Sequence, residues 1–290
     1  QRQMCIRDRH GIFLILGLIT VGCVLLITVY LVISGVPAIA KIGLFQFLFG
    51  TKWASTASEP SFGILPFIMT SIYGTGGAIL LGVPVGFFTS VYLAKIASPK
   101  VRGVIETAVS LLAGIPSVVY GFFGLMIIVP WVRDTFRPYY GGNGLSLFSA
   151  ALLLGIMILP TIISISESAI RSVPDKYYQG ALALGATHER SVFRTVVPAA
   201  KSGIMAAVVL GVGRAIGETM AVMMVAGNQA RVPSSIFKGV RTLTANIVME
   251  MGYATDLHRE ALIATGVVLF VFILIINVSF SILKRRTKDN

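Results

Sequence analysis

Charged residues are scarce in this sequence of 290 residues, at 12% of the total, whereas soluble domains carry about 25%. Hydrophobic residues reach 55%, with a mean hydropathy of +0.85. Lysine and arginine outnumber acidic residues 24 to 12, for a net charge of +12. In a soluble chain that excess would favour nucleic acid as a partner. The hydropathy excludes a nucleic-acid-binding protein, because the few charges must lie between long apolar runs, as in a polytopic membrane protein.

Side chains for catalysis or metal binding are also few. The two cysteines, Cys5 and Cys23, offer no disulfide framework and no metal-ligand spacing. Three histidines are scattered, and the run His188-Glu189 lacks the second histidine of a zinc-protease motif. The sequence contains no G-x-x-x-x-G-K-[ST] run for binding nucleotide phosphates. We therefore predict that the chain is not an enzyme and holds no metal or cofactor of its own.

Six long apolar runs predict an all-α membrane protein, because about 20 apolar residues are enough for a helix to cross the hydrocarbon layer. We expect spans near 11–36, 66–94, 107–132, 145–167, 202–228 and 261–283. They form one transmembrane domain, 11–283, and a basic tail follows at 284–290. Residues 1–10 begin without methionine, and we treat them as a separate segment of native or foreign origin without functional weight. The uncharged run 60–94 exceeds what one span needs, so we expect its early part, 60–66, to be re-entrant or interfacial.

The orientation follows from the lysines and arginines in the connecting segments, since positive loops stay in the cytoplasm. With the N-terminus inside, 15 of these residues lie on the inner side and eight on the outer side. The cluster Lys284-Arg285-Arg286 makes the C-terminus the firmest anchor. The sequence therefore predicts an N-in, C-in topology.

The long inner segment, 171–201, has the pattern of two short helices at the membrane surface. Pro174 favours a helix start and Gly185 a helix stop, while Thr187 suits the N-cap of a second helix that Pro198 closes. From spacing alone, an ordinary amphipathic connector explains the segment equally well.

This segment resembles the cytoplasmic loop of permease subunits from binding-protein-dependent ABC importers, in which E-A-A is followed by three residues, Gly, nine residues and I-x-L-P. Gln179-Gly180-Ala181 stands at the E-A-A position, Gly185 matches the glycine, and Pro198 matches the proline after Thr195-Val196-Val197. The resemblance implies that 179–188 forms a coupling helix that docks on a separate ATPase subunit. The residues assigned to coupling are Gln179, Gly180, Ala181, Gly185, Ala186 and Pro198.

The fifth span carries two charges, Arg214 and Glu218, and their spacing predicts an ion pair at i, i+4 on one helix face. Arg214 would lie about 18 Å from the Ser202 end, near the middle of the hydrocarbon layer. Charges at that depth pair with each other or face a watery cavity, and they commonly mark a solute path. A structural salt bridge at the close-packing motif Gly213-x-x-x-Gly217 is the alternative. Because a guanidinium binds phosphate or carboxylate with two hydrogen bonds, we favour an oxyanion path.

Several runs resemble the PstC family of phosphate-importer permeases. They are Gly213 to Asn228, Arg241 to Ile247, Met249 to Gly252, and Gly114 to Gly124. The resemblance implies a bacterial inner-membrane subunit that moves inorganic phosphate inward, with Arg214 and Glu218 on the substrate path. It also implies a PstA-like second permease, two PstB-like ATPase subunits holding ATP and Mg, and a PstS-like extracytoplasmic phosphate-binding protein that docks on the outer loop, 227–260.

Two alternatives remain open from the residues. An arginine does not distinguish tetrahedral anions, so molybdate or sulfate is possible as the substrate. A stand-alone secondary transporter would use Arg214 and Glu218 as an ion relay, although it has no need of a docking segment at 171–201. We interpret the individual charges of the outer loop, 227–260, as ordinary solvated polarity.

Overall fold

The computed structural model describes the backbone of residues 2–288 and the side chains of residues 12–279 and Ile282. The basic side chains of Lys284, Arg285 and Arg286 lie outside the described residues. Their predicted role as a cytoplasmic anchor therefore stays a prediction.

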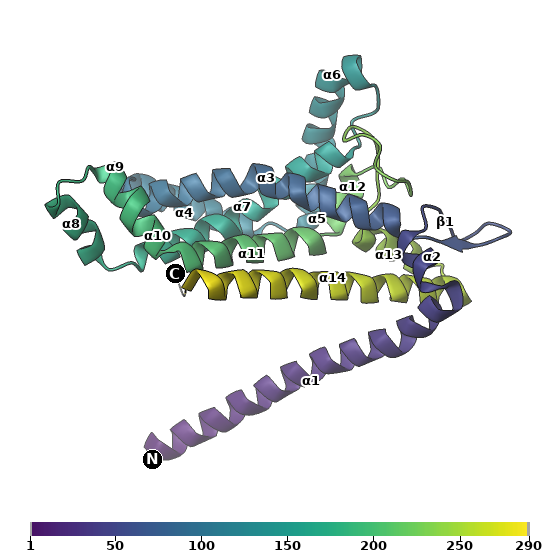
Figure 1. Cartoon of the computed structure of the whole chain (residues 1–290), viewed down its shortest axis with the longest axis horizontal. Helices are drawn as coiled ribbons and strands as arrows, with labels where there is room; N and C mark the ends of the chain where they lie inside the picture. Colours follow the sequence, from purple (N-terminus) through teal and green to yellow (C-terminus); the bar gives the residue numbers. More distant parts are fainter. Residues whose placement is uncertain (1, 289–290) are drawn as a thin grey trace.

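Four long helices run side by side along one axis: α3 (Leu65–Lys95), α7 (Leu147–Arg171), α11 (Lys201–Gly217) and α14 (Asp256–Lys288) (Figure 1). Both chain ends lie at the same end of this bundle as α8 (Asp175–Ala183), which we call the inner end. The hairpin of β1 (Trp53–Ala54) and β2 (Ser61–Phe62) lies at the opposite, outer end. The N-in, C-in orientation across a membrane stays a prediction.

Within the part of the chain that the structure describes, five helices are long and apolar enough to cross a membrane: Ile12–Ile42, Leu65–Lys95, Ser117–Tyr140, Leu147–Arg171 and Asp256–Ser279. A sixth crossing is counted if the bent pair 188–199 and 201–217 forms one span. The first, second, fourth and sixth predicted spans overlap these helices closely. The third and fifth predicted spans differ from the structure, and a helix break is the reason in both.

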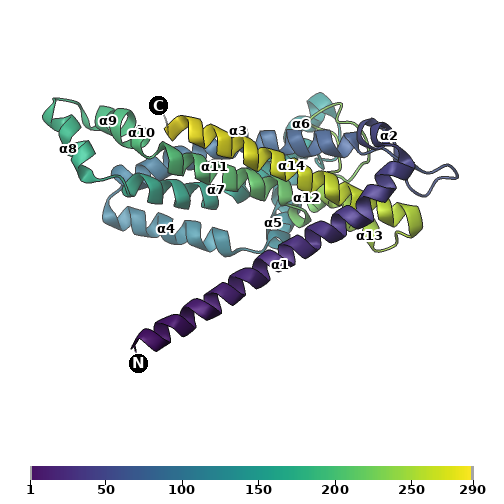
Figure 2. The same ribbon diagram turned by 60° about the horizontal axis from the view of Figure 1, so that its bottom comes forward.

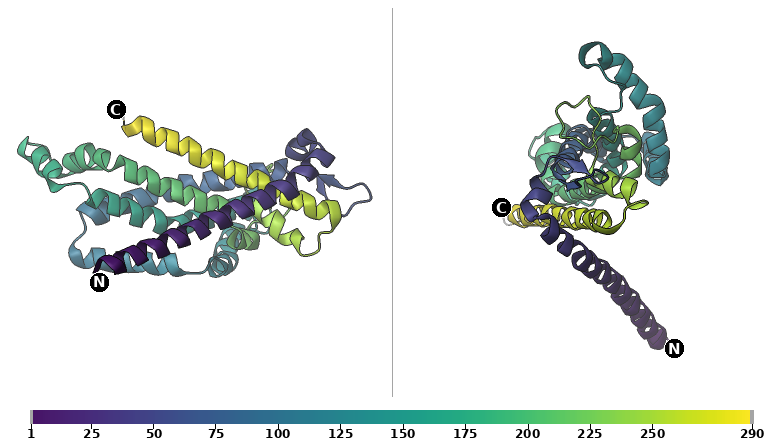
Figure 3. Two further views of the ribbon diagram at one scale, coloured as in Figure 1. Left: turned by 90° about the horizontal axis from the view of Figure 1, so that it is seen from below. Right: turned by 90° about the vertical axis from the view of Figure 1, so that its right-hand side faces the viewer.

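The predicted third span, 107–132, is not one straight helix. The helix α4 (Pro99–Gly114) stops before Pro116, because proline lacks a backbone N–H and forces Ile115 into an extended conformation. The chain resumes as a rod made of α5 (Ser117–Phe123), the π-helix η1 (Gly124–Ile128) and α6 (Val129–Tyr140). This rod turns across the bundle axis and ends in the projecting helix α6 (Figures 1 and 3).

The helix α7 forms the centre of the bundle, packed closely against α3 through glycines. A methyl group at Gly82 would come within 2.8 Å of the Gly155 carbonyl oxygen, and one at Gly86 within 2.8 Å of Ile162. The missing side chains let the two helix backbones approach, as Gly-x-x-x-Gly spacing commonly does in membrane helices.

The first helix, α1 (Arg2–Ile42), packs against α14 near its outer end. There, Gly35 faces Ala264 and Val267 of α14, while the inner half of α1 leans away from the other helices (Figures 2 and 3). Its apolar side chains are exposed from Ile12 to Tyr30, so this half needs lipid or another subunit around it. After the short helix α2 (Leu44–Phe49) comes the β1–β2 hairpin, and the segment 60–66, expected to be re-entrant or interfacial, contains strand β2 and the start of α3.

Replacing Gly82 with alanine should destabilise the protein by about 1–3 kcal/mol, because the methyl group would overlap the α7 backbone. Thermal unfolding of the purified protein in detergent measures the effect. Gly76→Ala is the matched control on the same helix, since nothing lies within 4 Å of its added methyl group. Equal unfolding temperatures for the two variants would contradict the close packing of α3 on α7.

Candidate functional site

Arg214 lies in the last turn of α11, where a positive charge suits the negative end of the helix dipole. Its side chain is half-buried, and its Nη1 donates a hydrogen bond of 3.3 Å to Thr161 Oγ1 on α7. Among the described residues, no carboxylate lies within ion-pair distance of Arg214. The guanidinium therefore keeps donors free for another ligand.

The predicted i, i+4 ion pair between Arg214 and Glu218 is wrong, because the helix breaks between them. The helix α11 ends at Gly217, Glu218 is extended, and α12 (Met220–Val225) begins two residues later. Glycines at 213 and 217 weaken the helix here. The Glu218 carboxylate instead accepts hydrogen bonds from the backbone N–H groups of Thr219 and Ala221, at 3.1 and 3.3 Å. Glu218 thus satisfies donors that the break would leave without partners.

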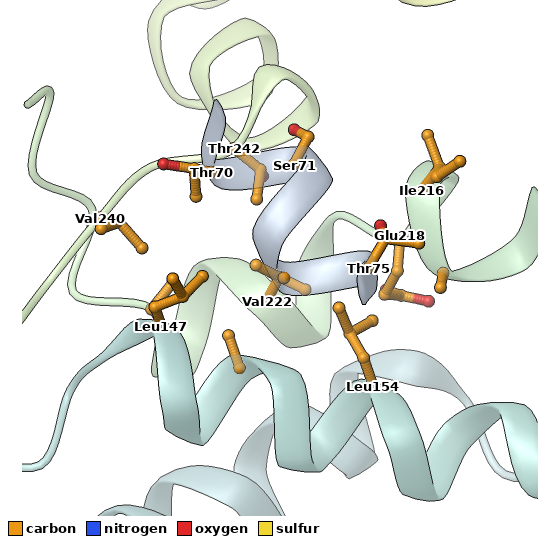
Figure 4. A pocket seen from close by; sticks show the side chains of 14 residues that line it. Thr70, Ser71, Thr75, Leu147, Leu154, Ile216, Glu218, Val222, Val240 and Thr242 are labelled. Atoms are coloured by element: carbon orange, nitrogen blue, oxygen red, sulfur yellow. The ribbon is translucent and has the colours of Figure 1, made fainter. Parts of the chain in front are cut away.

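Hydroxyl groups from other elements hold the broken segment. Thr244 Oγ1 donates to the Glu218 carbonyl oxygen at 3.0 Å, and Ser71 Oγ accepts from the Leu243 backbone N–H at 3.1 Å. Between these groups lies a cavity of about 10 Å³, with Glu218 beside Thr75 in its wall (Figure 4). Such a space holds about one water molecule, so this cavity is too small for a larger anion in this conformation.

The predicted coupling residues lie together at the inner end, far from Arg214 (Figure 1). Gln179, Gly180 and Ala181 belong to α8, and Gly185 follows it with a φ of +83°. The Ala186 backbone N–H donates to the Ala181 carbonyl oxygen at 3.1 Å, which completes a C-terminal cap. The positive φ explains why glycine is favoured at position 185.

We call residues 175–199 the inner unit. Its second helix is α9 (His188–Ser191), and Thr187 caps this helix as predicted by accepting a hydrogen bond from the Arg190 backbone N–H. The chain continues through the π-helix η2 (Val192–Val196) and α10 (Val197–Ala199), where Pro198 lies exposed. The helix α11 then leaves at an angle of 70°. Through this bend, the inner unit is covalently joined to the helix that carries Arg214.

At the outer end, a buried carboxylate joins the stretch 241–258 to the distant β1–β2 hairpin region. Glu250 on α13 (Leu243–Met251) is 6% exposed and accepts hydrogen bonds from Arg241 at 2.6 Å and from Trp53 at 2.8 Å. Ser55 and His258 Nε2 lie 3.1 and 2.8 Å from the same carboxylate. The interpretation of Arg241 and Glu250 as solvated charges is therefore wrong. In the sequence, the spacing of Leu243, Asn246 and Glu250 was the signal that Glu250 lies on the buried face of a helix.

The pKa of Glu250 reflects this environment. Burial alone would raise the pKa of the carboxyl, but the hydrogen bonds from Trp53, His258 and Arg241 outweigh burial and hold the pKa below its ordinary value.

Residues 82–289 match the family described as "binding-protein-dependent transport system inner membrane component". The chain belongs to this family. Its permeases are transport components of an inner membrane, so the predictions of a multi-pass membrane location and of a transport subunit that is not an enzyme are confirmed.

Three relatives cover most of the chain. The probable ABC transporter permease protein YqgH of Bacillus subtilis (strain 168) is 39% identical over 268 residues, 90% of this chain and 86% of the relative. The phosphate transport system permease protein PstC of Mesorhizobium japonicum is 36% identical, over 80% of this chain and 76% of its own. PstC of Haemophilus influenzae is 32% identical, over 91% and 87%. The predicted resemblance to PstC is confirmed.

Solved structures of ABC transporters share the fold of this permease. A bacterial alginate ABC transporter aligns with a TM-score of 0.67 at 17% identity, over 96% of each chain. The methionine transporter MetNI in an inward-facing conformation aligns with a TM-score of 0.59 at 19% identity, over 78% of this chain and 94% of its own. The predicted helical permease architecture is thus confirmed.

Replacing Glu250 with glutamine should destabilise the protein at neutral pH by about 3–5 kcal/mol, because Arg241 loses its buried partner. The stabilisation from a lowered pKa is fully present above about pH 4.3, the ordinary value for glutamate, and it is lost as the pH falls through the lower folded value. The gap in unfolding temperature between wild type and Glu250→Gln should therefore shrink in acid. Glu59→Gln, at an exposed site in the hairpin, is the control. A gap that is constant with pH would contradict the role of the ionised carboxylate.

Proposed function

We propose that this chain is a permease subunit of an ATP-driven importer that carries inorganic phosphate into the cytoplasm, with Arg214 as the residue that handles the anion. The observation that carries the proposal is the Arg214 guanidinium, half-buried in a membrane-spanning segment and bonded to the neutral hydroxyl of Thr161. The relatives named as phosphate transport permeases support phosphate as the substrate.

The chemistry of the guanidinium fits a phosphate ion. Its planar donors form paired hydrogen bonds with phosphate oxygens, and it stays positively charged at every working pH. A charge held inside a membrane protein at this depth is costly unless it serves a path or a partner. Without a carboxylate partner among the described residues, Arg214 can exchange its single Thr161 bond for bonds to a passing anion.

Glu218 has a different role in this proposal from the one its sequence position suggests. Its carboxylate caps the first turn of α12 and its carbonyl is held by Thr244. Glu218 therefore keeps the break beside Arg214 in shape and leaves the guanidinium free. On the substrate path, Arg214 would bind the anion and Glu218 would fix the local backbone.

The proposed transporter needs partners that supply energy and substrate. A PstA-like permease would complete the pore, and two PstB-like ATPase subunits would hold ATP and Mg. A PstS-like binding protein would deliver phosphate at the outer end. On the inner unit, Leu184 is 90% exposed between α8 and Gly185. An apolar side chain so exposed next to a fixed turn is suited to bury itself in a cleft of the ATPase.

Replacing Arg214 with alanine should lower phosphate uptake by roughly ten- to a hundredfold, the effect of losing hydrogen bonds to a charged group. Uptake is measured in liposomes containing the assembled transporter, binding protein and ATP, together with ATP hydrolysis. Arg137→Ala, at an exposed arginine on α6, should transport normally. A variant that fails to assemble would favour a structural role for Arg214, and preferential uptake of sulfate or molybdate by wild type would overturn the substrate.

Replacing Leu184 with aspartate should weaken co-purification of the ATPase by about tenfold or more, since a central apolar anchor commonly contributes 2 kcal/mol or more to an interface. Binding of the ATPase to the permease in detergent measures the change directly. Tyr139→Asp, 79% exposed on α6 at the opposite end of the bundle, is the control. Unchanged ATPase binding by Leu184→Asp would remove the docking role of the inner unit.

A further inference from the structure

The inner half of α7 presents one accessible polar face. Thr161 is half-buried, and Ser164, Ser168 and Arg171 are exposed. Their spacing of three, four and three residues places them in one row along the helix. These four residues are named here the polar row of α7. The polar residues outside it, Ser166 and Glu167, are buried.

The length of the polar row matches half of a membrane. Thr161 and Arg171 are ten residues apart, which is about 15 Å along a helix, and the hydrocarbon layer is about 30 Å thick. Exposed hydroxyl groups at this depth are poorly accommodated by lipid, because lipid tails offer no hydrogen bonds. The polar row therefore borders water or protein in the assembled transporter.

A cavity lies against this row. It has a volume of about 370 Å³ between α4 and α7, and its polar lining comprises Glu106, Ser110, Ser164, Glu167, Ser168 and Arg171. A water molecule occupies about 30 Å³ of liquid, so the cavity has room for a hydrated inorganic anion. The cavity at the helix break, by contrast, has room for about one water. A larger cavity of about 450 Å³ lies toward the outer end, but its walls are mainly apolar side chains of α3 and α7. The cavity against the polar row is therefore the one that offers an anion polar groups on the inner side of Arg214.

The charges around the cavity balance. Arg171 Nη1 lies 3.5 Å from a Glu167 carboxylate oxygen and 3.6 Å from one of Glu106, and Arg102 Nε lies 3.3 Å from the same Glu106 oxygen. Two positive and two negative groups leave no net charge. An anion here meets no strong repulsion, and both arginines already have carboxylate partners. Such a site suits passage and release better than tight binding.

We infer that the polar row of α7 lines the inner half of the path for the oxyanion, from Arg214 to the inner end. Thr161 is the connecting residue, because it belongs to the row and also accepts the hydrogen bond from Arg214. The hydroxyls of Ser164 and Ser168 then replace part of the hydration shell of inorganic phosphate. This inference rests on the proposed role of Arg214, and it adds the direction in which the anion leaves.

Cysteine accessibility tests the inference in the assembled transporter. Cys5 and Cys23 are first replaced by serine, and Ser164→Cys or Ser168→Cys is introduced. The matched control is Val85→Cys on α3, since Val85 is 54% exposed and neighbours Gly86, which lies against Ile162 of α7. Inside-out membrane vesicles are treated with a membrane-impermeant, negatively charged methanethiosulfonate, with and without inorganic phosphate.

A cysteine beside a watery path forms the reactive thiolate, whereas apolar surroundings raise its pKa. We therefore expect positions 164 and 168 to react about tenfold faster than position 85, or more. Phosphate should slow their reaction, and the attached label should block uptake. Ser110→Cys, in the facing helix of the same cavity, serves if a substitution in α7 prevents assembly. Reaction no faster than at position 85, or labelling that leaves uptake intact, would overturn the path along α7. Neither result depends on Arg214→Ala, whose normal uptake would instead refute the proposed function.

Discussion

Hydrocarbon offers no hydrogen bonds, and each irregular feature of this protein is arranged around that constraint. A membrane-spanning helix satisfies its own backbone, but a break exposes N–H and carbonyl groups that need other partners. At the break between α11 and α12, Glu218 accepts from two backbone N–H groups and Thr244 donates to a carbonyl. The Arg214 guanidinium likewise has a hydrogen-bond acceptor, the Thr161 hydroxyl. Small residues of α3 set the position of α7, and α7 carries the Thr161 hydroxyl that accepts from Arg214.

The sequence predicted the parts of the fold that depend on local composition. The uncharged runs at 66–94 and 145–167 became α3 and α7 almost without change, because a long apolar run has little alternative to a buried or lipid-facing helix. The turn at Gly185 and the cap at Thr187 were also predictable, since each depends on the backbone preferences of one residue.

Features that depend on distant residues escaped prediction. The break at Glu218 is held in part by Thr244, 26 residues later in the chain, and the i, i+4 spacing of Arg214 and Glu218 suggested an intact helix instead. The Glu250 cluster gathers Trp53 and His258 from segments about two hundred residues apart. Charge counts made Glu250 look like one more solvated residue of an outer loop. The row from Thr161 to Arg171 was readable in the sequence, but only exposure separates it from the buried Ser166 and Glu167.

Because of the 70° bend between α10 and α11, a small rotation of the inner unit produces a larger displacement at the far end of α11. Arg214 lies 13 residues beyond the start of α11 at Lys201, so it sits at the end of a lever arm of about 20 Å. A tilt of ten degrees about the bend would swing the guanidinium through about 3.5 Å. That stroke is as long as its 3.3 Å bond to Thr161, so a small rotation at the inner surface is enough to change the partner of one charge deep in the membrane.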